Sequence, residues 1–178
     1  MVALIVAIAA PVVAELRVSG ISVFLNDADV TVHVALLGAI PPSFSESLRS
    51  GIPSHLRFVV ELWQYRRAWP DRHLQTKTIE RQIQYNVLTK EFKVASLAGE
   101  TREPYITREL RDAEHVLSEV RGLKLMAVSQ LESSQLFYVR VRAEAALRVA
   151  NTFLTRLSGE AEETPWVQSS LLTVNRTQ

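Results

Sequence analysis

The segment from Trp63 to His73 has the most unusual side chains of the sequence. It interleaves aromatic and cationic residues, and Asp71 is its only acidic member. A guanidinium group over an aromatic face gains about 0.5–2 kcal/mol, and the same surface could stack a planar or anionic ligand. The residues of this candidate binding surface are Trp63, Tyr65, Arg66, Arg67, Trp69 and Arg72.

A structural interpretation explains the same residues without a ligand. In it, Trp69 to Arg72 form a hairpin turn, because Pro and Asp favour turns. Trp63 and Tyr65 would then pack across neighbouring strands, with the arginine stems covering them. Aromatic residues are common beside strand turns, so we favour the hairpin and keep the binding surface as the alternative.

Metal-binding motifs are absent from the sequence. Asp27 and Asp29 resemble the start of a calcium loop, but the later ligand positions do not fit, and a turn explains them better. A spacing of one, three or four residues would place two histidine ligands on one strand or helix. No two of the histidines have that spacing: they are His33, His55, His73 and His115.

Local signatures of catalysis are also missing. The chain has no Gly-x-Ser-x-Gly elbow, no glycine-rich phosphate loop and no Ser-x-x-Lys. It has no cysteine, which removes disulfides, thiolate nucleophiles and cysteine-ligated metals together. We therefore predict that the protein is not an enzyme and that it carries no catalytic residues, metal or cofactor.

Composition indicates an ordinary globular domain. Of 178 residues, 47% are hydrophobic and 22% charged, which is enough apolar material for a packed core. The 20 basic and 19 acidic residues leave a formal charge of +1. No global field exists to hold nucleic acid or an anionic membrane, so recognition by charge must be local.

The first residues are typical of an export leader. Residues 1–14 carry no charged side chain and end in small residues after Pro11, as a signal peptidase requires, although no basic residue precedes the apolar run. As a helix this run is too short to span a bilayer. We expect a cleaved signal peptide, a single β-rich domain over residues 15–178, and a periplasmic or otherwise extracytoplasmic location.

Alternation of apolar and polar residues dominates the rest of the chain. It is regular over residues 29–36, 56–63, 79–87 and 137–145, which predicts strands with one wet face. Before them, the apolar residues change from even-numbered to odd-numbered positions at Gly20, as a β-bulge would produce. Residues 92–97 and 123–128 are shorter strand candidates, and 166–174 is a candidate edge strand. Short connections favour antiparallel pairing.

Two segments have helical spacing instead. A capping-box pattern, Ser43 to Glu46, predicts a short helix over about 43–50, with Gly51 as its stop. A long helix is predicted over about 108–121, followed by Gly122. We predict a mainly β fold with these two helices, either an antiparallel sandwich or a curved antiparallel sheet. An α+β arrangement is the alternative.

Four segments in this order are similar to a known family. They are Pro41 to Pro53, Trp63 to Arg72, Ile83 to Val94, and Tyr138 to Arg142. Together they resemble the bacterial domain-of-unknown-function family 4390 over nearly all of the chain after residue 14. The resemblance implies an exported protein without an assigned reaction. It also implies an envelope-signalling context, because members are often encoded beside a membrane histidine kinase.

These observations give two expected functions. The first is a non-catalytic envelope domain that binds another protein, such as a histidine kinase, through the Trp63 to His73 surface or an exposed strand edge. The second is a carrier of an apolar ligand between the sheet and the long helix. An enzyme ranks third, because every local motif for catalysis is missing.

Overall fold

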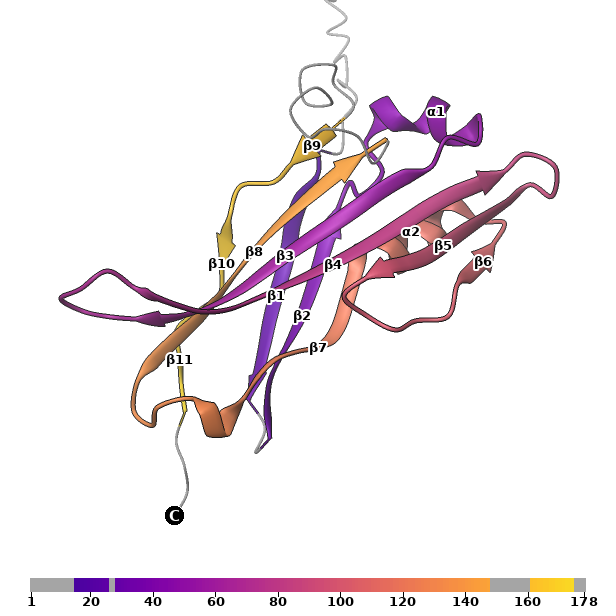
Figure 1. The fold of residues 1–178 in the computed structure, drawn as a ribbon. Coiled ribbons are helices and arrows are strands. Elements are labelled where there is room, and N and C mark those ends of the chain that lie inside the picture. Colours follow the sequence, from indigo (N-terminus) through magenta and orange to yellow (C-terminus); the bar gives the residue numbers. More distant parts are fainter. Residues whose placement is uncertain (1–14, 26–27, 148–160, 175–178) are drawn as a thin grey trace, which may run out of the picture.

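The computed structural model describes residues 15–25, 28–147 and 161–174. These residues are mostly strands, arranged in two facing sheets (Figure 1). Every pairing between the described strands is antiparallel. The predicted antiparallel β fold is therefore confirmed. The expected leader and Asp27, at the start of the expected turn, lie outside the described residues.

The smaller sheet has the order β1-β2-β7. Its strands are β1 (Arg17–Leu25), β2 (Asp29–Leu37) and β7 (Glu119–Ala127). The register of β1 on β2 shifts between Val18 and Gly20, which is the bulge that the change of parity predicted. The shift leaves Val18, Ile21 and Val23 packed against the core.

The larger sheet has the order β10-β8-β3-β4-β5-β6, and two further strands pair with β8. The central strands are β3 (Ser54–Tyr65), β4 (Arg72–Asn86) and β8 (Leu136–Ala146). On one side of them lie β5 (Glu91–Ala98) and β6 (Tyr105–Thr107). On the other side are β9 (Ala161–Glu163), β10 (Val167–Gln168) and β11 (Leu172–Thr173). The candidate edge strand over 166–174 is thus two short strands.

The core lies between the sheets. The apolar face of the predicted strands points mostly inward, although Val87 and Leu97, at the ends of theirs, are exposed. Burying one inward-facing side chain contributes about 1.5–3 kcal/mol. The fully enclosed members include Val30 and Val32 from β2, and Phe58 and Val60 from β3. The opposite parity of β3 and β8 forms the polar outer face of the larger sheet.

The predicted long helix is shorter than expected, because its last residues belong to a strand. The helix α2 runs over Leu110–Ser118, and Glu119 is already extended, with φ −109° and ψ 124°. Glu119 and Val120 pair with β2, so sheet pairing overrides the helical spacing of the sequence. Gly122 has φ +69°, yet it lies in a bulge of β7 and does not terminate the helix.

The predicted short helix also differs in detail. Pro42–Phe44 form a 3-10 turn, η1, which leads into the helix α1 (Ser45–Arg49). The capping box is not formed, since no side chain caps either N-terminus and the Ser43 hydroxyl lies 3.4 Å from Glu162 Oε1. Gly51 comes after the helix with φ +88°, as its stop position predicted. A second 3-10 turn, η2, covers Val128–Gln130.

A buried arginine fixes α2 against the larger sheet. Arg81 of β4 is only 2% exposed. Its guanidinium donates to the backbone carbonyls of Val116, Leu117 and Glu119 at 2.8, 3.1 and 2.6 Å. Two further bonds, of 2.5 and 2.9 Å, reach both carboxylate oxygens of Glu100. The cation therefore satisfies carbonyls at the C-terminal end of α2, where the helix dipole is negative.

Candidate binding surface

The hairpin of β3 and β4 carries the residues that the sequence singled out. Its strands pair as far as Gln64 and Arg72, and residues 66–71 form the connecting loop. The predicted turn at Trp69 to Arg72 is therefore a longer loop that begins at Arg66. The hairpin projects away from the body of the larger sheet, at the left of Figure 1. We call residues 65–72 the Trp69 tip.

At the base of the hairpin, Trp63 is packed on several sides. Its ring stacks on Tyr138 of β8, with centroids 6.5 Å apart and planes 10° from parallel. The guanidinium of Arg140 lies 4.2 Å from the Trp63 ring centroid. The indole Nε1 donates to Glu61 at 2.8 Å, and the His73 ring approaches edge-on at 5.1 Å. Trp63 is thus a structural part of the outer face.

Arg140 connects this base to the C-terminal strands. Its guanidinium lies over two indole rings, that of Trp63 and that of Trp166 at 4.5 Å, and its Nε donates to Glu61 Oε2 at 2.6 Å. Arg142, the next outward residue of β8, also lies over Trp166 at 4.9 Å. Sequence reasoning expected the stems of the tip arginines to cover the aromatic rings. The arginines that cover the indole rings come instead from β8, where the side chains of Arg140 and Arg142 both lie on the outer face of the sheet.

Asp71 anchors the loop to the sheet. Its Oδ1 accepts from the backbone amide of Arg66 at 2.9 Å, and its Oδ2 accepts from the Tyr138 hydroxyl at 2.8 Å. Burial raises the pKa of Tyr138 to about 12, with the hydrogen bond and charge of Asp71 as further causes and Arg140 opposing them. Asp71, the only acidic residue of the segment, therefore satisfies its oxygens within the molecule.

The remaining tip residues point toward solvent. Trp69 is 74% exposed, and Tyr65 is 37% exposed. Arg66, Arg67 and Arg72 are exposed, and none of them forms an ion pair with a residue in the described ranges. The structure thus divides the six sequence-predicted residues. Trp63 belongs to the packed base, and the other five form an exposed, cationic and aromatic tip.

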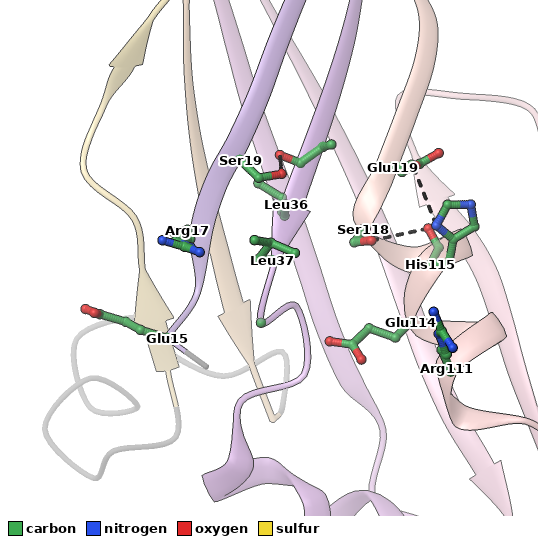
Figure 2. Close-up of a pocket in the computed structure, with 12 residues that line it drawn as sticks. Glu15, Arg17, Ser19, Leu36, Leu37, Arg111, Glu114, His115, Ser118 and Glu119 are labelled. Atoms are coloured by element: carbon green, nitrogen blue, oxygen red, sulfur yellow. Dashed lines mark hydrogen bonds and ion pairs between the residues drawn. The ribbon is translucent and has the colours of Figure 1, made fainter. Parts of the chain in front are cut away.

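A second candidate is a cleft of about 660 Å³ between the end of the smaller sheet and α2. Figure 2 shows Arg17 and Leu37 on the sheet side and Arg111, Glu114 and His115 on the helix side. Acidic and basic groups alternate around it, and His115 lies 3.5 Å from Glu119. A lining of mixed sign selects no charge class of ligand, so the Trp69 tip is the better candidate.

The histidines have local roles in the structure. His33 packs against the ring of Phe24, with centroids 4.7 Å apart, and His73 bonds Thr76 at 2.8 Å. Burial lowers the pKa of His55, against the opposing charge of Glu80. Within the described residues, no group of three or more His, Asp or Glu side chains has an arrangement that could hold a metal ion.

None of the helices in the described ranges combines the length and the apolar character that crossing a bilayer requires. Comparison with known proteins gives one match. The family described as Domain of unknown function (DUF4390) matches residues 13–148, a range that includes the Trp69 tip, both sheets as far as β8, and α2. No curated protein and no solved structure matches the chain. Because the match covers more than half of the 178 residues, the chain belongs to the DUF4390 family.

Proposed function

We propose that the protein is a non-catalytic extracytoplasmic domain that binds another protein through the Trp69 tip. The observation that carries this proposal is the 74% exposure of Trp69 in the tip of the hairpin, where the only carboxylate, that of Asp71, is already bonded internally. Leaving an indole in water is unfavourable by the free energy that its burial would release. A partner surface would gain that free energy on binding.

The residue types of the tip support a protein partner. Trp, Tyr and Arg are the residues most enriched among the energetically dominant positions of protein interfaces. The tip supplies Trp69, Tyr65 and the three arginines within one loop and its flanking residues. Because its guanidinium groups lack ion pairs in the described structure, a partner's carboxylates could bind them without displacing existing pairs.

The anchoring of the tip also supports binding. The loop is tied at Arg66 and Asp71, and Asp71 is tied to Tyr138, near the start of β8. Trp63 and Arg140 pack directly below. A loop held in this way loses little conformational entropy when it meets a partner, which improves affinity.

These features specify the partner's chemistry. It should offer an apolar pocket for the indole of Trp69, rimmed by Asp or Glu side chains for the arginines. The leader pattern of residues 1–14 supports an extracytoplasmic location, where other envelope or membrane proteins are the available partners. We rank the extracytoplasmic part of a membrane histidine kinase first among them, on the envelope-signalling context that the sequence resemblance implies.

Photo-crosslinking in the envelope tests the proposal. A photoreactive amino acid replaces Ala68, an exposed loop residue beside Trp69, and in a matched protein it replaces Leu88, at the other end of β4. We expect a discrete crosslinked product from position 68 that disappears with Trp69→Ala and with Arg67→Ala, and none from position 88. Equal products at both positions, or a product insensitive to both substitutions, would contradict the proposal.

The carrier hypothesis receives less support. The inward-facing Val, Leu and Ile side chains that suggested it belong to one packed cluster with Ala113 and Leu117 of α2. Such packing is typical of an ordinary core. Mass spectrometry of the purified protein would detect a co-purified lipid, and a stoichiometric lipid would favour the carrier over the protein-binding proposal.

A further inference from the structure

The edges of the two sheets differ in how well they are protected against pairing with another chain. Natural sheets blunt their edges by shortness, charge and bulges. In the larger sheet, β6 and β9 have three residues each, and β10 and β11 have two. In the smaller sheet, β7 has nine residues, but it carries Glu119, Arg121 and Lys124 and has two register shifts against β2.

Strand β1 lacks most of this protection. It also has nine residues, and its only charged side chain is Arg17, at its first position. Among the described strands, only β2 is hydrogen bonded to it. After the bulge, residues 20–25 form a regular run of Gly, Ile, Ser, Val, Phe and Leu. A six-residue run with high β-propensity, no charge and no proline is the sequence type that pairs with further strands.

We propose that β1 is a self-association edge, which pairs antiparallel with β1 of a second copy of this chain about a two-fold axis near Ser22. The pairing would join two three-stranded sheets into one continuous sheet. This surface is separate from the Trp69 tip, so the proposal stands independently of the function proposed above.

The two faces of β1 suit this register. With Ser22 opposite its own symmetry mate, Ile21 lies opposite Val23 of the partner subunit on the core side. On the outer side, Gly20 lies opposite Phe24 of the partner subunit. The position of a Cβ on Gly20 has no atom within 4 Å. Phe24 packs on His33 but is still 48% exposed, so the uncovered part of its ring could cover the glycine of the partner subunit.

Charge favours a second copy in the antiparallel direction. Because Arg17 stands at one end of β1, antiparallel pairing places the two Arg17 side chains at opposite ends of the joint strand pair. Parallel pairing would bring these like charges together, which is destabilising. The rest of β1 has no charge that would select a different partner. The second copy, by contrast, supplies the same bare edge with a matching alternation.

The strength of this association should be modest. One pair of short strands buries less area than a standard stable interface. Backbone hydrogen bonds supply most of the affinity in strand addition. We expect a dissociation constant on the order of 10 µM, so that monomer and dimer both appear within an accessible range of protein concentration.

Analytical ultracentrifugation of the full chain tests the proposal. We expect wild-type protein to shift with concentration from the mass of one chain, 20.0 kDa, to twice that mass. Ser22 is exposed on the outer face, so Ser22→Lys and Ser22→Glu should each fold normally. Each variant alone places like charges opposite each other at the axis and should remain monomeric. Their equimolar mixture should dimerise at least as tightly as wild type.

A matched control and circular dichroism exclude indirect effects. Ser133→Lys makes the same change at an exposed loop position and should leave the dimer unchanged. Wild-type protein that stays monomeric up to about 200 µM, well above the expected constant, would overturn the proposal. The proposal would also be overturned if Ser22→Lys still dimerised. The same holds if Ser22→Lys and Ser22→Glu both fold but their mixture stays monomeric. If either variant misfolds, Ser22→Gln, which adds bulk without charge, should retain the dimer. A monomeric Ser22→Gln protein would count against the proposal.

Discussion

The two ends of β4 both present an exposed apolar side chain, but they differ in how that side chain is held. At one end is the Trp69 tip. At the other, the turn between β4 and β5 presents Leu88, which is 92% exposed. This second turn is closed by its own residues: Asn86 Oδ1 accepts from the amides of Leu88 and Thr89 at 2.9 and 3.2 Å, and the Lys90 amide donates to the Asn86 carbonyl at 2.8 Å.

The Trp69 tip depends on residues far away in the sequence. Its anchor, the bond from Tyr138 to Asp71, joins residues 67 positions apart. The tip also carries three exposed arginines without ion pairs in the described part of the chain, whereas the Leu88 turn, residues 87–90, carries Lys90 as its one cationic residue. Exposure of an apolar side chain alone is common on protein surfaces and indicates no function. The difference teaches that anchoring and charge together distinguish a candidate binding loop from an ordinary turn.

The largest expected effect comes from Arg81, which lies on β4 between the two ends. Arg81→Ala removes bonds to two α2 carbonyls and to the Glu119 carbonyl of β7, and it leaves Glu100 without its cation. Breaking a buried ion pair from one side costs about 3–5 kcal/mol, and we expect a loss of that size in urea unfolding. Arg81→Lys should lose less, because it keeps the charge.

Hydrogen exchange would show whether the loss of stability in Arg81→Ala is confined to one end of β4. Amides of α2 and of β5 should lose protection in Arg81→Ala, since α2 packs on that side of the sheet. The hairpin below Trp69 should keep its protection, because its anchors are Tyr138 and Arg140. Equal loss at both ends would show that β4 opens as one unit, and the two ends would then not be independent.

Truncation of the two exposed apolar side chains should separate binding from stability. We expect Trp69→Ala to weaken partner binding by about 2 kcal/mol or more, the size typical of a dominant interface residue, and Leu88→Ala to leave it unchanged. Both should change the free energy of unfolding by no more than about 0.5 kcal/mol, because both side chains are largely in water. Binding by titration and unfolding in urea measure the two quantities.

The opposite pattern for Trp69 would restore the purely structural interpretation of the hairpin. A large loss of stability with unchanged binding would mean that the indole supports the loop. Arg67→Ala serves as a second test of the same tip, since it removes charge without removing the ring. Its effect on binding should diminish at high salt, because exposed charges are screened.

The anchor of the Trp69 tip should respond to pH. Tyr138 has its pKa raised from 10 to about 12, so it ionises less readily in the folded state than in the unfolded state. Its stabilising contribution is therefore fully present below pH 10 and is lost as the pH rises toward 12. We expect wild type to lose about 2 kcal/mol more than Tyr138→Phe across this window in urea unfolding.

At neutral pH, Tyr138→Phe should itself cost about 1–2 kcal/mol, because it leaves one Asp71 oxygen without its donor. The Leu88 turn contains no ionisable group among its closing bonds, so its amide exchange should be the same in both proteins. Parallel pH profiles for wild type and Tyr138→Phe would show that this hydroxyl does not anchor the tip.

Local alternation in the sequence predicts the strands and the core, but it does not predict contacts between residues far apart in the chain. Alternation places Val30 to Leu36 and Leu56 to Leu62 in the core, and Gly20 at a bulge. It could not predict that Arg140 would lie over both Trp63 and Trp166, since the strand order that brings β10 beside β8 is set by tertiary packing.

The misplaced helix end has a similar cause. Helical spacing continues through Val116 and Val120, but pairing with β2 gains more than one further helical turn would. Arg81 illustrates the converse limit. It shares the apolar parity of Ile79 and Ile83, and only the fold reveals that the carbonyls of α2 satisfy it there. The Trp69 tip could be located from its composition, whereas its anchor could not.

The smallest expected effect sharpens the comparison at the Leu88 turn. Lys90 adopts φ +59°, a left-handed conformation that costs an L-residue about 1 kcal/mol and a glycine almost nothing. Lys90→Gly should therefore stabilise the protein by about 0.5–1 kcal/mol in urea unfolding, whereas Lys90→Ala, which keeps the Cβ, should not. Because the turn is closed by its own residues, this gain should leave partner binding and the exchange of the Trp69 hairpin unchanged. A change in binding would mean that the two ends of β4 communicate along the strand, and that the Trp69 tip is positioned by more than Asp71 and Tyr138.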